Sequence, residues 1–147
     1  MPHPPRARLL LAIALVLVSA AALPGTASAG PTQSERKLLR VINDVRTGHG
    51  ARRLSIGSGI QKSSHSWAAY LRNHDAFYHG RLRAGTSENI GWVTCRRGWA
   101  RTLARMWLNS SSHRPHLLGG AHRLGVGVST GSWSGYGCVR MAVTRFR

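Results

Sequence analysis

The stretch Leu124-Gly-Val-Gly-Val128, followed by Val139-Arg-Met-Ala-Val143, decides the fold class of this 147-residue chain. Both stretches alternate apolar residues with small or polar ones, and a period of two is typical of half-buried strands. The segment 131–137 between them is rich in Gly, Ser and aromatic residues, which indicates a turn. The pattern therefore predicts an antiparallel hairpin, with a further, shorter strand over Asn89 to Val93.

Upstream of the hairpin, the apolar spacing is that of helices. Thr32-x-x-Glu35 fits a capping box, and the apolar residues that follow it predict a first helix ending at Gly48. A second helix is predicted from near Ser58, and its inner face holds Ile60, Ser64, Trp67 and Leu71. A third is predicted from about Arg97 to Asn109, with one stripe of Trp99, Leu103, Met106 and Trp107. Helices first and strands later indicate an α+β fold, and the length allows a single domain.

Residues 1–29 have the order of a secretory signal peptide. Two arginines precede an apolar run from Leu9 to Ala22, and Ala27-Ser28-Ala29 offers small residues for cleavage. A membrane anchor is the alternative, but the run is too short to cross a bilayer core of roughly 30 Å as a helix. We therefore predict a secreted protein whose mature domain is residues 30–147, with no membrane span left after cleavage.

The composition is strongly basic, with 21 Lys and Arg against four Asp and Glu and a formal charge of +17. Residues 1–29 hold two of the arginines, so residues 30–147 carry 19 Lys and Arg, four acids and a formal +15. This excess favours an anionic partner such as a cell surface, a lipid or a wall polymer. The alternative is an arginine-rich composition without a binding role. No specific nucleic-acid motif is present in the sequence, and we expect a monomer.

The chain has two cysteines, Cys95 and Cys138. In an exported protein they meet an oxidising compartment, so one Cys95–Cys138 disulfide is the simplest prediction. Two buried free thiols are the alternative.

Three polar residues at the ends of predicted elements are candidates for chemistry: His79, Glu88 and His113. Two imidazoles and one carboxylate match a three-ligand zinc site with an open water position, and they also suit general acid–base catalysis. In the alternative interpretation, Glu88 caps backbone amides or pairs with an arginine, and the histidines bond nearby backbone. His116 lies three residues after His113 and is a further candidate for the same cleft, or a surface residue.

Five motifs in order resemble the CAP superfamily (cysteine-rich secretory proteins, antigen 5, pathogenesis-related 1), also called the SCP domain, in its short secreted bacterial branch. The resemblance covers roughly residues 36–146. The motifs are the first helix at 38–46, Phe77-Tyr78-His79, Ser87-Glu88-Asn89-Ile90, the stretch from Trp107 to Leu118, and Leu124-Gly-Val-Gly-Val128.

The resemblance implies an α-β-α sandwich with a small antiparallel sheet between helices, and a cleft that in many members holds two His and two Glu. His79, Glu88 and His113 fall on three of those positions, while the second Glu has no counterpart because Glu88 is the last acid in the chain. Zinc is the cofactor that such a set suggests, since magnesium and calcium prefer more oxygen ligands. The implied function is an extracellular binding or interaction module, with a zinc-assisted hydrolase using the same three residues as the alternative.

Overall fold

The computed structural model describes residues 30–147, and the signal-peptide prediction for residues 1–29 lies outside them. Eight elements follow one another along this part: α1 (Gln33–Gly48), β1 (Ser55–Ile56), α2 (Ser58–Asn73), β2 (Ser87–Thr94), α3 (Trp99–Leu108), α4 (Arg114–Leu118), β3 (Arg123–Trp133) and β4 (Tyr136–Phe146). Within residues 30–147, no helix is long and apolar enough to span a bilayer.

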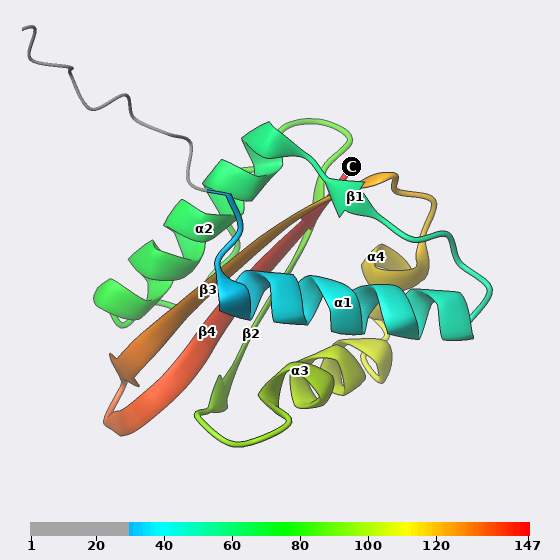
Figure 1. Ribbon diagram of the computed structural model, residues 1–147. Helices are drawn as coiled ribbons and strands as arrows, with labels where there is room; N and C mark the ends of the chain where they lie inside the picture. The colour runs from blue at the N-terminus through cyan, green and yellow to red at the C-terminus, as the bar shows by residue number, and fades with distance from the viewer. Residues whose placement is uncertain (1–29) are drawn as a thin grey trace, which may run out of the picture.

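The four strands form one sheet between two helical layers, which confirms the predicted α-β-α sandwich. The strand order is β1-β3-β4-β2, and β2, β4 and β3 pair antiparallel. The short β1 runs parallel to β3 at the edge and was not predicted. Figure 1 shows α2 on one face of the sheet and α1, α3 and α4 on the other. Each face therefore has its own apolar core, the larger one under α1, α3 and α4.

The predicted hairpin is confirmed, and its turn is tighter than the sequence suggested. The strands β3 and β4 continue to Trp133 and Tyr136, leaving only Ser134 and Gly135 at the turn. Both turn residues have positive φ, 46° and 80°, as a two-residue turn of the I′ type requires. The predicted disulfide is also confirmed: Cys95, just after β2, is bonded to Cys138 in β4, and their Cα atoms lie 5.5 Å apart.

Two glycines of β3 allow α2 to lie directly on the sheet. A Cβ on Gly125 would lie 2.2 Å from the carbonyl oxygen of Ile60, and one on Gly127 would lie 1.9 Å from that of Ser64. Both distances are far below van der Waals contact, so only glycine permits this approach of helix and strand backbones. The Gly-Val-Gly pattern therefore sets the distance between α2 and the sheet.

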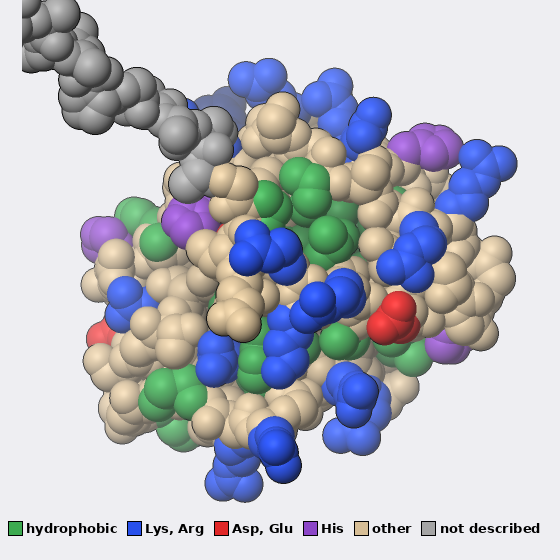
Figure 2. All heavy atoms as spheres, in the orientation of Figure 1, with side chains coloured by type: hydrophobic (Ala, Val, Ile, Leu, Met, Phe, Trp, Pro, Cys, Tyr) green, Lys and Arg blue, Asp and Glu red, His purple; other side chains and the backbone are tan. Residues whose placement is uncertain are grey.

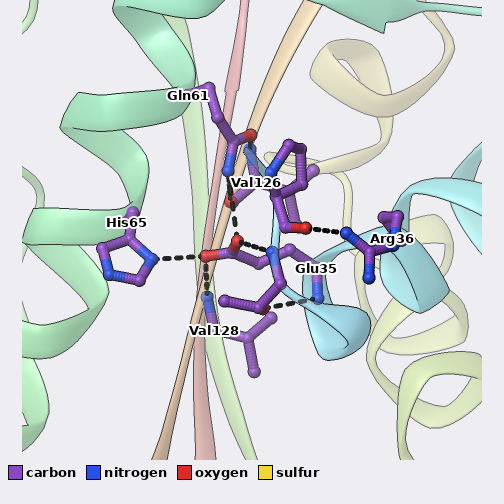
Figure 3. A network of polar contacts seen from close by, with 8 residues as sticks. Glu35, Arg36, Gln61, His65, Val126 and Val128 are labelled. Carbon is purple, nitrogen blue, oxygen red and sulfur yellow. Dashed lines mark hydrogen bonds and ion pairs between the residues drawn. The ribbon is translucent and has the colours of Figure 1, made fainter. Parts of the chain in front are cut away.

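Glu35 joins α1 to the free edge of β3 (Figure 3). It forms the predicted capping box with Thr32, and its carboxylate is almost fully buried. The same carboxylate accepts hydrogen bonds from the Val128 amide at 3.3 Å and from Gln61 Nε2 at 3.3 Å, and lies 2.7 Å from His65 Nδ1. Gln61 in addition bonds both the amide and the carbonyl of Val126. Glu35 and Gln61 thus provide hydrogen-bond partners for backbone groups of β3 along the part of its edge that β1 does not cover.

One predicted core position in α3 is wrong. Met106 is 49% exposed, although the spacing placed it on the apolar stripe. The helix buries Ala100 and Ala104 as well as its Trp and Leu residues. Because these two alanines face the interior, the buried face is rotated away from Met106, which lies at its margin.

Candidate functional site

The predicted site residues meet in one cleft. A cavity of about 300 Å³ is lined by His79 from the loop before β2, Glu88 from β2, His113 at the start of α4 and His116 within α4. Residues separated by 37 positions in sequence are thus brought together because β2 and α4 lie side by side and the loop after α2 returns beside them. The cleft also includes His116, which in the sequence was only a further candidate.

Glu88 is fully buried, and each of its oxygens is engaged. Oε1 accepts from the Gly80 amide at 3.0 Å and lies 2.9 Å from His79 Nδ1. Oε2 accepts from Arg145 Nε at 2.8 Å, and Arg145 is itself only 7% exposed. Glu88 and Arg145 are directly paired across β2 and β4, so the register of the sheet places the two charges in contact. The alternative in which Glu88 pairs with an arginine therefore describes this structure.

The three cleft histidines are all oriented through Nδ1. His79 Nδ1 faces Glu88, His113 Nδ1 lies 2.8 Å from Ser110 Oγ, and His116 Nδ1 lies 2.9 Å from Asn89 Oδ1. A carboxylate or amide oxygen can only accept, so Nδ1 of His79 and of His116 carries the proton. In the neutral form of these two rings, Nε2 keeps a lone pair.

The surroundings of His113 disfavour its charged form. Burial lowers the pKa of this imidazole below its usual value, and the nearby His79 and His116 lower it further. The neutral ring is thus the stable form of His113 at neutral pH, and it can accept a hydrogen bond or a proton.

Asn89 and Arg145 are the site residues that the sequence did not identify. Asn89 is fully buried; its Nδ2 donates to the His113 carbonyl at 3.2 Å while its Oδ1 orients His116. Arg145 lies beyond Val143, where the predicted strand ended, whereas β4 continues to Phe146. The Ser-Glu-Asn motif was the available signal for Asn89, and the strand register is what reveals Arg145.

The residues fit a zinc ion only in part. Two imidazoles offer Nε2, but both oxygens of Glu88 are already occupied by Arg145, Gly80 and His79. Across residues 30–147, no three His, Cys, Asp or Glu side chains are grouped so that they could hold one metal ion. Zinc binding by His79, Glu88 and His113 therefore stays a prediction, and we derive no chemical step through a metal.

Several solved structures of other proteins are similar to this one in fold. An outer surface protein of Borrelia burgdorferi is 16% identical, with a TM-score of 0.57 over 79% of this chain and 93% of that one. An extracellular protein of Bacillus anthracis that contains an SCP domain is 17% identical, with a TM-score of 0.59 over 80% of this chain and 44% of that one. BmVAL-1 is 17% identical, with a TM-score of 0.60 over 85% and 80% of the two chains.

At these identities the likeness establishes the fold alone. No curated protein is similar enough in sequence to match. The model of the cysteine-rich secretory protein family, CAP, matches residues 39–143, which include all or most of every element from α1 to β4 and all four cleft residues. The chain therefore belongs to the CAP family.

Proposed function

We propose that this protein is an extracellular binding module whose histidine-lined cleft takes an anionic ligand from a cell surface, a lipid or a wall polymer. The signal-peptide pattern of residues 1–29 and the Cys95–Cys138 disulfide support export. Two proteins of similar fold, an outer surface protein of Borrelia burgdorferi and an extracellular protein of Bacillus anthracis, are consistent with that location.

The Glu88–Arg145 pair is the observation that carries this proposal. Glu88 is the one acidic residue lining the cleft in the described part of the chain, and Arg145 compensates its charge inside the protein. The other polar groups that line the cleft are three imidazoles and the hydroxyls of Thr86, Ser87 and Ser112. The hydroxyls can donate hydrogen bonds, and the Nε2 atoms of His79 and His116 donate when these rings are protonated, a form that a bound anion favours. The cleft therefore suits a ligand that is anionic and rich in acceptor oxygens.

The test is co-sedimentation of the mature protein with vesicles and with cell-wall material at about 0.15 M salt, where long-range attraction is screened. We expect retention by phosphatidylglycerol vesicles or by wall material, and none by phosphatidylcholine vesicles. The double variant His79→Ala/His113→Ala should reduce retention. The matched control, His49→Ala/His122→Ala, removes two exposed histidines outside the cleft. This control should be retained by the anionic material as strongly as the unmodified protein. Absence of retention by every anionic material would refute the proposal.

A zinc-assisted hydrolase is the second candidate, and one observation favours it. His79 and His116 each have Nδ1 held by an oxygen, so that in the neutral ring Nε2 has the lone pair, which is how metal-binding histidines are usually oriented. Zinc would supply an activated water to such a site. Calorimetry with zinc alone tests the idea: one equivalent bound by the protein, and none by His79→Ala, is the expected result. If the protein binds no stoichiometric zinc, the hydrolase proposal is wrong.

A further inference from the structure

A second cavity lies beside the histidine cleft and is lined by four arginines. It measures about 260 Å³, and its polar lining consists of Arg81, Arg83, Arg145, Arg147, Ser63 and Thr86. The start of α2, the loop before β2 and the end of β4 supply these residues, and Figure 1 shows the three segments meeting at one end of the sheet. We call this cavity the arginine pocket.

Only one of the four arginines in the arginine pocket, Arg145, is paired with an acid, and Arg81, Arg83 and Arg147 have no acidic partner among residues 30–147. No Asp or Glu among the described residues lines it, and Glu88 reaches Arg145 only through Nε. Within residues 30–147, the structure gives the terminal nitrogens of Arg145 no hydrogen-bond acceptor, although the residue is 7% exposed. Gathering four guanidinium groups around one cavity is electrostatically unfavourable, and a bound anion would relieve this repulsion.

Gly80 leaves room for Arg145 in this position. A Cβ on Gly80 would lie 2.5 Å from Arg145 Nη2 and 3.1 Å from the Trp67 ring. The Gly80 amide also donates to Glu88, so the same residue orients Glu88 and leaves space for its partner Arg145. Arg145 is thus held with Nε toward Glu88, and its side chain also lines the arginine pocket.

The chemistry of the lining selects the ligand. Guanidinium groups present planar, paired N–H donors that match the oxygens of a phosphate group, and hydroxyls add single donors. The volume lies just below the usual range for drug-sized ligands, about 300–1,000 Å³, so a compact anion suits it. We propose that the arginine pocket is a binding site for a phosphate group, either free or on a lipid headgroup.

This site adjoins the proposed binding cleft. Leu82 and Thr86 line both cavities, and the Glu88–Arg145 pair connects the two. A ligand with its phosphate in the arginine pocket could therefore extend over Leu82 toward the histidines. That the phosphate group belongs to a cell-surface ligand depends on the proposed function. The existence of a phosphate site in the arginine pocket does not depend on it.

The strongest rival is a basic groove between α1 and α3, on the face shown in Figure 2. It is larger, about 580 Å³, and is lined by Lys37, Arg40, Arg97 and Arg101. Its lining also contains Asp44, and all four of its cations are exposed, whereas the arginine pocket has the buried Arg145 beside its three exposed arginines. A groove of exposed cations attracts anions weakly and without fixed geometry, so it serves as the matched comparison.

The test measures binding of inorganic phosphate by calorimetry, in sodium chloride at constant ionic strength. The variant Arg81→Ala/Arg83→Ala removes two exposed arginines of the pocket, and Arg97→Ala/Arg101→Ala removes the same charge from the rival groove. We expect the pocket variant to bind phosphate at least about tenfold more weakly and the groove variant to change it less than about twofold. All four side chains are exposed, and circular dichroism should show that both variants are folded.

Three results would overturn the inference: no phosphate binding by the unmodified protein, equal losses in the two variants, or a larger loss in the groove variant.

A second arm of the test uses phosphatidylcholine vesicles with and without phosphatidic acid. Retention that inorganic phosphate displaces supports a headgroup as the source, and phosphate binding without retention supports a soluble phosphate compound. If phosphate binds but no anionic surface retains the protein, the proposed function fails while the pocket stands. If an anionic surface retains the protein but phosphate does not bind, the pocket fails while the proposed function stands.

Discussion

Glu88 organises the cleft because groups from two segments converge on its carboxylate in β2. His79 and Gly80 approach from the loop before β2, and Arg145 approaches from β4. A buried carboxylate without such partners would be strongly unfavourable. The main effect of the Glu88–Arg145 pair on stability is therefore that neither charge is buried without a partner. Glu88 thus acts as an anchor for the residues around it.

A double-mutant cycle measures this coupling. Arg145→Met should lower the free energy of unfolding by about 3–5 kcal/mol, because it leaves the Glu88 carboxylate buried without its cation. Glu88→Gln alone strands the Arg145 charge in the same way. The double variant should lose at least about 1 kcal/mol less than the sum of the two single losses. Urea denaturation gives the three values, and strictly additive losses would contradict the structural assignment.

The lowered pKa of His113 predicts a pH dependence of stability. Between that lowered pKa and the usual value of about 6.5, the unfolded chain binds more protons at this residue than the folded protein does. Stability should therefore rise with pH through this window, and the destabilising effect is complete only below the folded pKa.

The measurement is the melting temperature in a chelating buffer between about pH 7.5 and pH 5, a range that spans the titration of an ordinary histidine. His113→Gln should lose less stability on acidification than the unmodified protein. His49→Gln is the control, because His49 is exposed at the end of α1 and lies outside the cleft. An identical acid-induced loss in the His113→Gln variant and the unmodified protein would show that His113 is not responsible.

At the scale of single residues, the sequence identified the site residues that lie in a recognisable motif. It missed the residues whose role depends on how strands and helices pack. His79, Glu88 and His113 could be chosen from residue type and motif, and the structure places all three in the cleft. Arg145 could not, since one more arginine in an arginine-rich chain carries no signal until strand register pairs it with Glu88. Glu35 was predicted as a helix cap, but its contacts with β3 and α2 depend on how the layers meet.

Among the elements, α2 lies directly against β3, and glycine makes this possible. The helix backbone lies against Gly125 and Gly127, where any side chain would collide with carbonyl oxygens of Ile60 and Ser64. Since α2 also begins at the arginine pocket, its distance from the sheet affects the proposed site as well as the core. The distance between α2 and the sheet therefore determines both the packing of the core and the geometry of the arginine pocket.

Gly127→Ala tests this contact. The new methyl group would lie 1.9 Å from a backbone oxygen that cannot rotate away, so α2 must move. We expect a loss of about 3 kcal/mol in the free energy of unfolding, at the upper end of typical overpacking costs. Gly137→Ala in β4 is the control: it meets nothing within 4 Å and should change stability by less than about 1 kcal/mol. Similar losses in both variants would mean that the close approach has no energetic effect.

The elements that sequence periodicity predicts best are the amphipathic ones. The helices α1 and α2 and the hairpin have apolar residues at regular spacing, and the structure contains all three near their predicted positions. The two-residue β1 has no periodicity of its own, because its pairing depends entirely on β3 being in place. Met106 was misplaced for a related reason: small alanines in α3 face the interior, and hydrophobicity alone does not reveal which side they take.

Over the whole molecule, the few acids are all engaged. Glu88 meets Arg145, Glu35 meets His65, Asp44 lies 3.6 Å from Arg53, and Asp75 accepts from the Ser134 amide. Most of the remaining Lys and Arg side chains face solvent, as Figure 2 shows for one side. The residues 30–147 thus carry a formal +15 with no acidic patch to balance it, and the folded state concentrates this charge.

This excess predicts that salt stabilises the protein. Repulsion among exposed cations falls as the screening length shrinks from about 30 Å at 0.01 M salt to about 8 Å at 0.15 M, so the melting temperature should rise over that range in sodium chloride. Phosphate at matched ionic strength should raise it further if the arginine pocket binds it, because a ligand of the folded state adds its own stabilisation. Scanning calorimetry separates the two contributions: Arg81→Ala/Arg83→Ala should lose the phosphate increment and keep the chloride response. A melting temperature that falls or stays constant with added chloride would mean that charge repulsion does not limit the stability of this fold.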